Sequence, residues 1–171
     1  MKKEPILIVD ENDNVIGIKD RGLVGVGSPD IYRVSALWVT NGRGDALLVQ
    51  RAFSKRNDAG KWGPAVSGTV EAGETYDSNI LKEAREEIGL SDMKFRKSRK
   101  VRRYGDHNFF VQWYVAVVDI PAESFETEAG SIEDIRWFPI DELRKETVFF
   151  PEKFVPNMYE YLDLSDGIVS G

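Results

Sequence analysis

The segment from Gly68 to Leu90 constrains the fold of this chain more than any other part of the sequence. A glycine-containing loop leads into a stretch, Tyr76–Ile88, with no glycine or proline. Apolar residues recur along it at helical spacing, at Ile80, Ala84 and Ile88. Gly89 follows directly and suits the left-handed conformation that commonly closes a helix. The segment therefore predicts a loop and then a helix, with one flank packed against a core.

The same helix carries three carboxylates on its other flank. Glu83, Glu86 and Glu87 are three and four positions apart, so at about 100° per residue they fall within an arc of about 100°. Like charges held this close repel one another, and a hard divalent cation that prefers oxygen ligands would neutralise them. The pattern predicts a metal site. The alternative is an ordinary solvent-facing helix, on which Lys82 and Arg85 pair with nearby glutamates.

The spacing resembles the Nudix box, whose members typically hydrolyse a nucleoside diphosphate linked to another group. The matching positions are Gly68, Glu74, Glu83, Glu86, Glu87, Gly89 and Leu90. Two positions depart from the family pattern: Lys82 stands in place of an arginine, and Ala84 in place of a larger aliphatic residue. The resemblance covers the chain from about Tyr32 to Glu146. It implies an α/β/α sandwich of the α+β class, with a mixed sheet between helices.

The resemblance also implies how the site is built. It assigns the metal, Mg²⁺ or Mn²⁺, to the carboxylates of Glu83, Glu86 and Glu87 and to the carbonyl oxygen of Gly68. One of the carboxylates would serve as the base for a metal-activated water, and Glu83 is our candidate. The expected reaction is metal-dependent hydrolysis of a phosphoanhydride bond, in a nucleoside diphosphate linked to another group or in a related diphosphate.

Glu74 and Lys82 match family residues that support the loop and orient the catalytic helix. Lysine offers a single ammonium where arginine offers a planar fork, so this departure bears on the efficiency of the site. The alternative interpretation is a surface ion pair of little consequence. A loop before the last strand often supplies a further carboxylate in the family, but Ser131 stands where we align that residue. Nearby candidates are Glu126, Glu128 and Glu133.

Several residues are candidates for contacts with substrate. Arg51, Lys55 and Lys61 lie on the loop that leads to the box and are expected to reach phosphate groups. Trp62 could stack on a base, although aromatic residues at strand ends more often belong to the core. Trp113, inside a long apolar stretch, is expected in the core, and His107, the only histidine, on the surface.

The segment Arg96–Arg103 is strongly basic, whereas the chain as a whole is acidic. Six cations fall within eight positions from Arg96 to Arg103, while the formal net charge is -6. We interpret the segment as a solvated strand and loop; the alternative is a basic wall that holds a substrate phosphate. The net negative charge argues against a general nucleic-acid-binding protein, because affinity for the phosphate backbone comes from clustered lysine and arginine.

The remaining elements follow from periodicity and turn residues. We expect an N-terminal β-hairpin around the polar turn Asn12–Asn14, and a loop at Gly22–Pro29. Further strands are expected at Val34–Thr40, Ala46–Gln50, Ala65–Val70, Phe109–Asp119 and Asp134–Phe138. A short helix should open at Asp141, and an amphipathic helix should span Pro151–Leu164. This order favours residues 1–31 as a hairpin and linker, 32–164 as one hydrolase domain of the α+β class, and 165–171 as a frayed tail.

Composition narrows the cellular setting and the chemistry. The chain has 171 residues and no cysteine, which excludes disulfides, thiolate metal sites and a cysteine nucleophile. No apolar stretch approaches the length of a membrane span. We therefore expect a soluble cytoplasmic protein that acts on a small-molecule diphosphate, with no nucleic-acid or membrane partner. The N-terminal hairpin could serve as the contact of a homodimer.

Three competing functions remain. A Nudix-like module that binds a nucleotide or diphosphate without turning it over would suit the changes at Lys82 and Ser131. Isomerisation of isopentenyl diphosphate is favoured by the N-terminal segment, which resembles the isopentenyl-diphosphate-isomerase-like branch of Nudix proteins. That family relies on a cysteine in the strand leading to the box, where this chain has Gly63–Ser67 without one. Hydrolysis of an RNA cap has only the Arg96–Arg103 segment in support.

Overall fold

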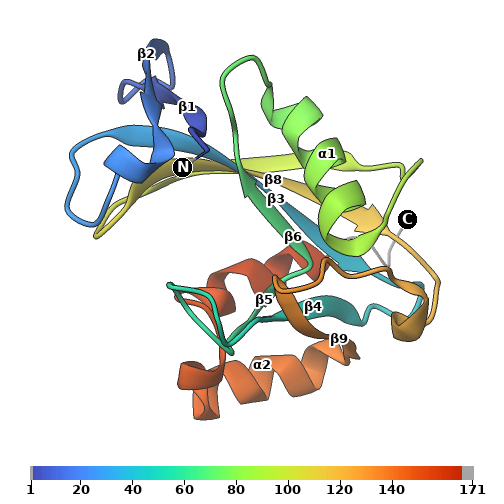
Figure 1. Ribbon diagram of the computed structural model, residues 1–171. Helices are drawn as coiled ribbons and strands as arrows, with labels where there is room; N and C mark the ends of the chain where they lie inside the picture. The colour runs from blue at the N-terminus through green and yellow to red at the C-terminus, as the bar shows by residue number, and fades with distance from the viewer. Residues whose placement is uncertain (1, 167–171) are drawn as a thin grey trace.

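The computed structural model describes residues 2–166, which form one mixed sheet of nine strands with helices on both faces (Figure 1). The strands are β1 (Pro5–Val9), β2 (Val15–Asp20), β3 (Ile31–Thr40), β4 (Ala46–Arg51), β5 (Trp62–Pro64), β6 (Val66–Thr69), β7 (Arg96–Arg103), β8 (Asn108–Val117) and β9 (Ile132–Phe138). The α-helices are α1 (Tyr76–Ile88) and α2 (Ile140–Phe149). Four 3₁₀ helices complete the described chain: η1 (Arg21–Leu23), η2 (Ala122–Ser124), η3 (Pro151–Lys153) and η4 (Met158–Ser165). No helix within 2–166 is long and apolar enough to cross a membrane.

Strand β3 organises the sheet. It runs parallel to β8 along its whole length, from the Ile31–Asn108 pair to the Thr40–Val117 pair. It also pairs antiparallel with β1, β4 and β6. A strand covered on both faces reads as a nearly continuous apolar run, and residues 35–40 are all buried. The mixed sheet confirms the expected fold class.

Two hydrophobic cores lie on opposite faces of the sheet. Because successive side chains of a strand point to opposite faces, Leu37 packs into one core and Trp38 into the other. The apolar flank of α1 fills the first core. Side chains of α2 and of the C-terminal segment, among them Leu143 and Tyr161, fill the second. This arrangement is the predicted α/β/α sandwich.

Helix α1 begins and ends where the sequence predicts. Thr75 and Ser78 form a reciprocal capping box, in which Thr75 Oγ1 accepts from the Ser78 N–H at 3.0 Å and Ser78 Oγ accepts from the Thr75 N–H at 2.9 Å. At the other end Gly89 adopts the left-handed conformation, with φ of 67°. Both signals are local in sequence, which explains why the bounds could be predicted.

The N-terminal hairpin is confirmed as β1 and β2, and it joins the main sheet through β1 and β3. Its turn is anchored by Asp13, whose carboxylate accepts hydrogen bonds from Arg33 Nε at 2.7 Å, Lys100 Nζ at 2.6 Å and the Tyr76 hydroxyl at 3.0 Å. Tyr76 is the first residue of α1. The hairpin turn is therefore tied directly to the start of that helix.

The continuous amphipathic helix expected over Pro151–Leu164 is wrong. The segment forms η3 and η4 instead, separated around Pro156 and Asn157. Proline has no N–H and disfavours the helical conformation of the residue before it, and Asn157 has a positive φ of 63°. Phe154, Met158, Tyr161 and Leu162, the residues expected on the apolar side of the segment, are nevertheless buried. Ser165, where we placed the start of a frayed tail, is buried and accepts a hydrogen bond from Trp38 Nε1; residues 167–171 lie outside the described part.

Candidate active site

Gly68 of β6 lies directly beneath the side chain of Glu83. A Cβ atom built on Gly68 would come within 2.4 Å of Glu83 Cδ, a distance that real Cβ atoms do not reach. Only a glycine lets the carboxyl group approach this backbone so closely. The fold therefore brings together Gly68 and Glu83 of the predicted site. The close contact explains why a residue with a side chain would not fit at position 68.

Glu87 lies beside the same strand, where its Oε2 atom accepts a hydrogen bond from the Ser67 N–H at 3.2 Å. Burial, followed by the negative charge of Glu83, raises the pKa of Glu87 to about 8. Burial also raises the pKa of Glu83; Lys82 opposes this effect and Glu86 adds to it. The pKa values of Glu83 and Glu87 are thus both raised. This shows that the protein does not supply enough positive charge nearby to stabilise both groups in the ionised form.

These donors fit a divalent cation. Carboxylate oxygens are the ligands that Mg²⁺ and Mn²⁺ prefer, and a cation would relieve the repulsion between Glu83 and Glu87. Glu86, the third predicted ligand, is exposed to solvent. Within residues 2–166 no three histidine, cysteine, aspartate or glutamate side chains already converge on a common metal position. The structure thus brings Glu83 and Glu87 together but does not yet gather all three glutamates.

Lys82 links the loop before α1 to the carboxylate flank. Its Nζ atom lies 2.6 Å from Glu74 Oε1, 3.2 Å from Glu71 Oε1 and 3.6 Å from Glu83 Oε1. Burial would lower the pKa of Lys82, but the hydrogen bonds to Glu74 and Glu71 hold it above its ordinary value. Side chains of Lys82 and Glu74 are only 24% and 18% exposed, so the pair is not a simple surface ion pair.

Asn79 completes this network, although the sequence analysis did not single it out. It is fully buried one turn before Glu83, and its Nδ2 donates to Glu74 Oε2 at 2.9 Å and to Thr69 O at 3.1 Å. Ser35 of β3 donates to Asn79 Oδ1. An available signal was its spacing four residues before Glu83, which places an amide on the carboxylate flank.

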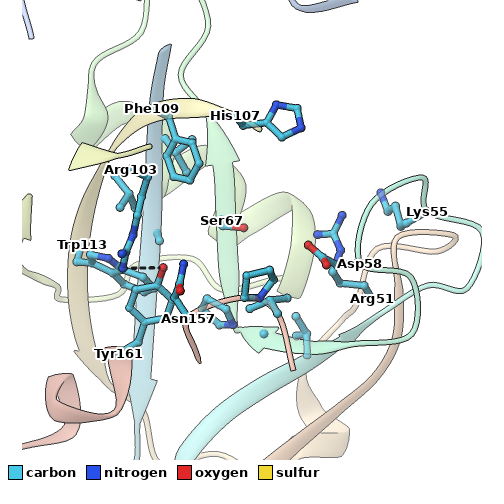
Figure 2. A pocket seen from close by; sticks show the side chains of 18 of the residues that line it. Arg51, Lys55, Asp58, Ser67, Arg103, His107, Phe109, Trp113, Asn157 and Tyr161 are labelled. Carbon is cyan, nitrogen blue, oxygen red and sulfur yellow. Dashed lines mark hydrogen bonds between the residues drawn. The ribbon is translucent and has the colours of Figure 1, made fainter. Parts of the chain in front are cut away.

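A cavity of about 490 Å³ opens beside this site, and Glu87 forms part of its wall. Ser67, labelled in Figure 2, lines it as well. Figure 2 shows Arg51, Lys55 and Asp58 gathered on one side of it. Lys55 donates to Ser131 Oγ at 3.0 Å. Ser131, which we aligned with a frequent family glutamate, thus contacts a lysine at the cavity wall.

The other end of the cavity is largely apolar and aromatic. Sheet residues line it, together with residues of the C-terminal segment: Val34, Ala36, Phe109, Val111, Trp113, Val155, Pro156, Asn157 and Tyr161. Arg103 and His107 also line the cavity. His107 was expected on the surface; it is instead partly buried. Trp113 is in the core as predicted, with 1% of its surface exposed.

The structure separates the four predicted substrate contacts into two groups. Arg51 and Lys55 line the cavity. Lys61 forms an ion pair with Asp58 at 3.3 Å and is not part of the lining. Trp62 packs edge-to-face on Phe138, with ring centroids 5.0 Å apart, and is likewise outside the lining. Neither residue is therefore placed to touch a ligand in this cavity.

The basic segment of β7 is mostly engaged with acidic side chains. The ion pairs are Lys97–Asp77, Arg99–Asp163, Lys100–Asp13, Arg102–Glu11 and Arg103–Glu160. Of the six cations only Arg103 lines the cavity. The segment was interpreted as a solvated strand and loop; it is a strand over its whole length, with its first five residues exposed, and not a basic wall. Sequence alone could not single out Arg103, because that distinction depends on its pairing with Phe109 of β8.

Comparison with known proteins supplies an independent view. The model of the NUDIX domain family matches residues 30–158. The isopentenyl-diphosphate Delta-isomerase of Serratia proteamaculans is 30% identical over 156 residues, covering 88% of this chain and 85% of that protein. An uncharacterized Nudix hydrolase of Pseudomonas aeruginosa is 32% identical over 100 residues, 55% of each chain. A crystal structure of a Deinococcus radiodurans protein has a TM-score of 0.78 at 21% identity, covering 95% of this chain and 99% of that one.

Proposed function

This chain belongs to the NUDIX domain family and is a hydrolase of that family, and from this premise we propose a reaction for it. The proposed reaction is metal-dependent hydrolysis of a phosphoanhydride bond, in a nucleoside diphosphate linked to another group or in a related diphosphate. Such a reaction forms one P–O bond to water, breaks one bridging P–O bond and releases a proton that a base must accept.

The observation that carries this proposal is the position of Glu87. It lies beside Glu83 at the carboxylate flank of α1 and also forms part of the cavity wall. A ligand in the cavity would therefore present its phosphates to the carboxylates. Arg51 and Lys55, on the same wall, offer positive charge to those phosphates.

Glu83, Glu86, Glu87 and the carbonyl of Gly68 would hold Mg²⁺ or Mn²⁺. When bound, this cation supplies neutralisation of the phosphate charge and acidification of the attacking water. Glu83 is the residue we propose as the base, because its carboxyl lies against Gly68 and burial raises its pKa. Lys82, held by Glu74, keeps that carboxyl in place.

The test is hydrolysis of a panel of nucleoside diphosphate sugars, dinucleoside polyphosphates, nucleoside triphosphates and non-nucleotide diphosphates. Each is assayed with Mg²⁺ or Mn²⁺ and, as a control, with excess chelator. Release of phosphate or nucleotide that depends on the metal supports the proposal. No turnover, combined with a raised melting temperature for one compound, favours a module that binds without catalysis.

Isopentenyl diphosphate isomerisation is the second candidate, favoured by the similarity to the Serratia proteamaculans protein over most of both chains. The isomerase family relies on a cysteine in the strand leading to the box. This chain contains no cysteine, and β5 and β6 carry glycine, proline, valine and serine there. Incubation with isopentenyl diphosphate distinguishes the two, because isomerisation releases no phosphate.

A further inference from the structure

A second cavity, of about 590 Å³, lies between the segment before β1, the η1 region and the β4–β5 loop. Four cations and two anions belong to its wall: Lys2, Lys3, Arg21 and Arg56 against Glu4 and Asp20. The whole chain, by contrast, has a formal net charge of -6. A concave wall on which one sign of charge prevails concentrates ions of the opposite sign. The second cavity is therefore a place where this acidic protein attracts an anion.

The two acidic residues of this wall already have partners. Asp20 Oδ1 accepts a hydrogen bond from the Gly22 N–H at 2.9 Å and caps η1. Glu4 forms an ion pair with Arg21, with Oε2 3.7 Å from Nη1. The other three cations of the wall form no ion pair within residues 2–166; they are Lys2, Lys3 and Arg56. All three are exposed to solvent, so their charged groups can reach a ligand.

Tyr32 adds a neutral hydrogen-bond donor to the same wall. Burial raises the pKa of its hydroxyl, and the charge of Arg21 opposes this effect only in part. The phenol therefore keeps its proton at neutral pH. The influence of Arg21 also shows that the hydroxyl lies on the side of the ring that faces the cations.

The second cavity adjoins the first, which lies beside α1. His107 lines both cavities, and the β4–β5 loop separates them. Within this loop Lys55 and Asp58, both labelled in Figure 2, line the first cavity, whereas Arg56 and Asn57 line the second. One molecule can therefore contact both cavities by passing His107.

Backbone hydrogen bonds hold the walls of the second cavity together. The Arg21 N–H donates to Glu4 O at 2.9 Å and joins η1 to the segment before β1. The Gly27 N–H donates to Asp106 O at 2.8 Å and joins the loop after η1 to the turn before β8. A cavity whose walls are already ordered loses less conformational entropy when a ligand binds.

We propose that the second cavity is a phosphate-binding subsite, which holds a phosphate monoester at the far end of a substrate whose diphosphate lies near Glu87. The inference rests on the proposed function, because it extends the same substrate beyond the first cavity. The substrate passes His107 and enters the second cavity. There the guanidinium of Arg56 and the ammonium groups of Lys2 and Lys3 donate charge-assisted hydrogen bonds to the terminal phosphate.

A phosphate monoester suits this wall better than a neutral group does. It carries close to two negative charges at neutral pH and has three strong acceptor oxygen atoms. Three cations without an acidic partner can neutralise that charge and donate to those atoms. A neutral sugar or hydrocarbon end gains nothing from them. The wall therefore selects diphosphates that carry an additional phosphate monoester.

The experiment uses two matched pairs of diphosphates, NADP⁺ with NAD⁺ and coenzyme A with dephospho-coenzyme A. In each pair only the first member carries an additional phosphate monoester. The phosphate preference is the ratio of the two kcat/KM values, measured with Mg²⁺ at low and high ionic strength. We expect wild type to prefer the phosphorylated member of at least one pair by about tenfold at low salt. Added salt should reduce this preference, because the cations are exposed.

Arg56→Gln should remove most of the preference, mainly through a higher KM for the phosphorylated member. Arg96→Gln is the matched control, because Arg96 is also exposed, is absent from the ion pairs within residues 2–166 and lines neither cavity. It should keep the wild-type preference. A double variant, Lys2→Gln with Lys3→Gln, should also reduce the preference and provides a second test if Arg56→Gln does not fold.

The kinetic outcomes separate this inference from the proposed function. Equal kcat/KM values within both pairs, or a preference that Arg56→Gln leaves unchanged, overturn the subsite and leave the hydrolase intact. Inorganic phosphate is then added alone during hydrolysis of NAD⁺. If it changes kcat and Arg56→Gln removes that change, the cavity takes a separate phosphate ion, and the assignment to the substrate is overturned.

If wild type hydrolyses neither pair, calorimetric binding of NADP⁺ and NAD⁺ decides the assignment. Tighter binding of NADP⁺ that Arg56→Gln removes and Arg96→Gln keeps supports the subsite, and equal affinities overturn it. The proposed function fails only if the wider panel of diphosphates is not hydrolysed either.

Discussion

The Nζ atom of Lys82 lies 2.6 Å from Oε1 of Glu74, and this ion pair joins helix α1 to the loop that precedes it. The same ammonium also lies 3.6 Å from Glu83. A lysine can therefore take the place that arginine holds in the family pattern. The pair matters because side chains that orient metal ligands set the geometry of the site.

We predict that Lys82→Arg keeps or raises activity, whereas Lys82→Met lowers kcat/KM by about 10- to 100-fold through looser positioning of Glu83. An arginine fork could contact Glu71 and Glu74 together, since both already lie within reach of Lys82. Steady-state kinetics at several metal concentrations would measure both effects. Lys97→Met, which removes an exposed ion pair to Asp77 on the same helix, is the control and should change little.

A large loss of activity in a folded Lys82→Arg variant would contradict the orienting role. Circular dichroism of the variant would show whether the fold is intact.

Glu86→Gln and Glu87→Gln should each abolish metal-dependent turnover and leave the fold intact. In metal-free protein, Glu87→Gln should keep or raise the melting temperature, because it removes a partly buried carboxyl group whose ionisation is opposed by burial and by the charge of Glu83. Phosphate release and thermal unfolding measure the two effects. Glu142→Gln on α2, which is exposed and not part of the cavity wall, should behave as wild type. Full activity in both site variants would refute the metal-site assignment.

Gly68→Ala should abolish most activity at a small cost in stability. The new Cβ would meet Glu83 Cδ at 2.4 Å, and the flexible glutamate side chain can only yield by leaving its position. We expect kcat to fall by about 100-fold, the scale for a misplaced catalytic group. Gly17→Ala is the matched control, since a Cβ there meets nothing within 4 Å. Wild-type kinetics in Gly68→Ala would show that the close approach has no catalytic role.

Asp13 should contribute stability that depends on pH. Burial raises the pKa of Asp13, but hydrogen bonds from Lys100, Arg33 and Tyr76 outweigh burial and leave the pKa below its ordinary value of 3.8. A carboxyl with a lowered folded-state pKa stabilises the protein above its unfolded pKa and loses that effect as the pH falls through the folded value. The contribution is therefore complete at neutral pH and declines below about pH 4.

Asp13→Asn should accordingly destabilise the protein by about 1.5–3 kcal/mol at pH 7, because it removes a carboxylate that is only 9% exposed and accepts charge-assisted hydrogen bonds from the partly buried Arg33 and the exposed Lys100. The difference from wild type should shrink in urea unfolding at pH 3. Asp163→Asn removes an exposed pair with Arg99 and should cost no more than about 1 kcal/mol. A difference for Asp13→Asn that stays constant between pH 7 and pH 3 would contradict the assignment.

Sequence by itself determined the elements whose signals are local. The bounds of α1, the left-handed Gly89 and the N-terminal hairpin depend on residues close together in the chain, and all three are as predicted. The carboxylate flank of α1 was equally visible, because helical spacing decides which side chains are neighbours. Pro156 was also a local signal for a break, but our prediction followed only the apolar spacing of the segment.

Tertiary structure alone decided which residues surround the cavity. Arg103 differs from the other cations of β7 only because its register with β8 brings it to the cavity. Trp62 turns onto Phe138, while Trp113 packs on Tyr161, a residue far away in sequence. These contacts depend on strand pairing and packing between distant segments, in which a shift of one residue exchanges the two faces of a strand. The residues around Arg103 in the sequence do not show which residue of β8 lies opposite it.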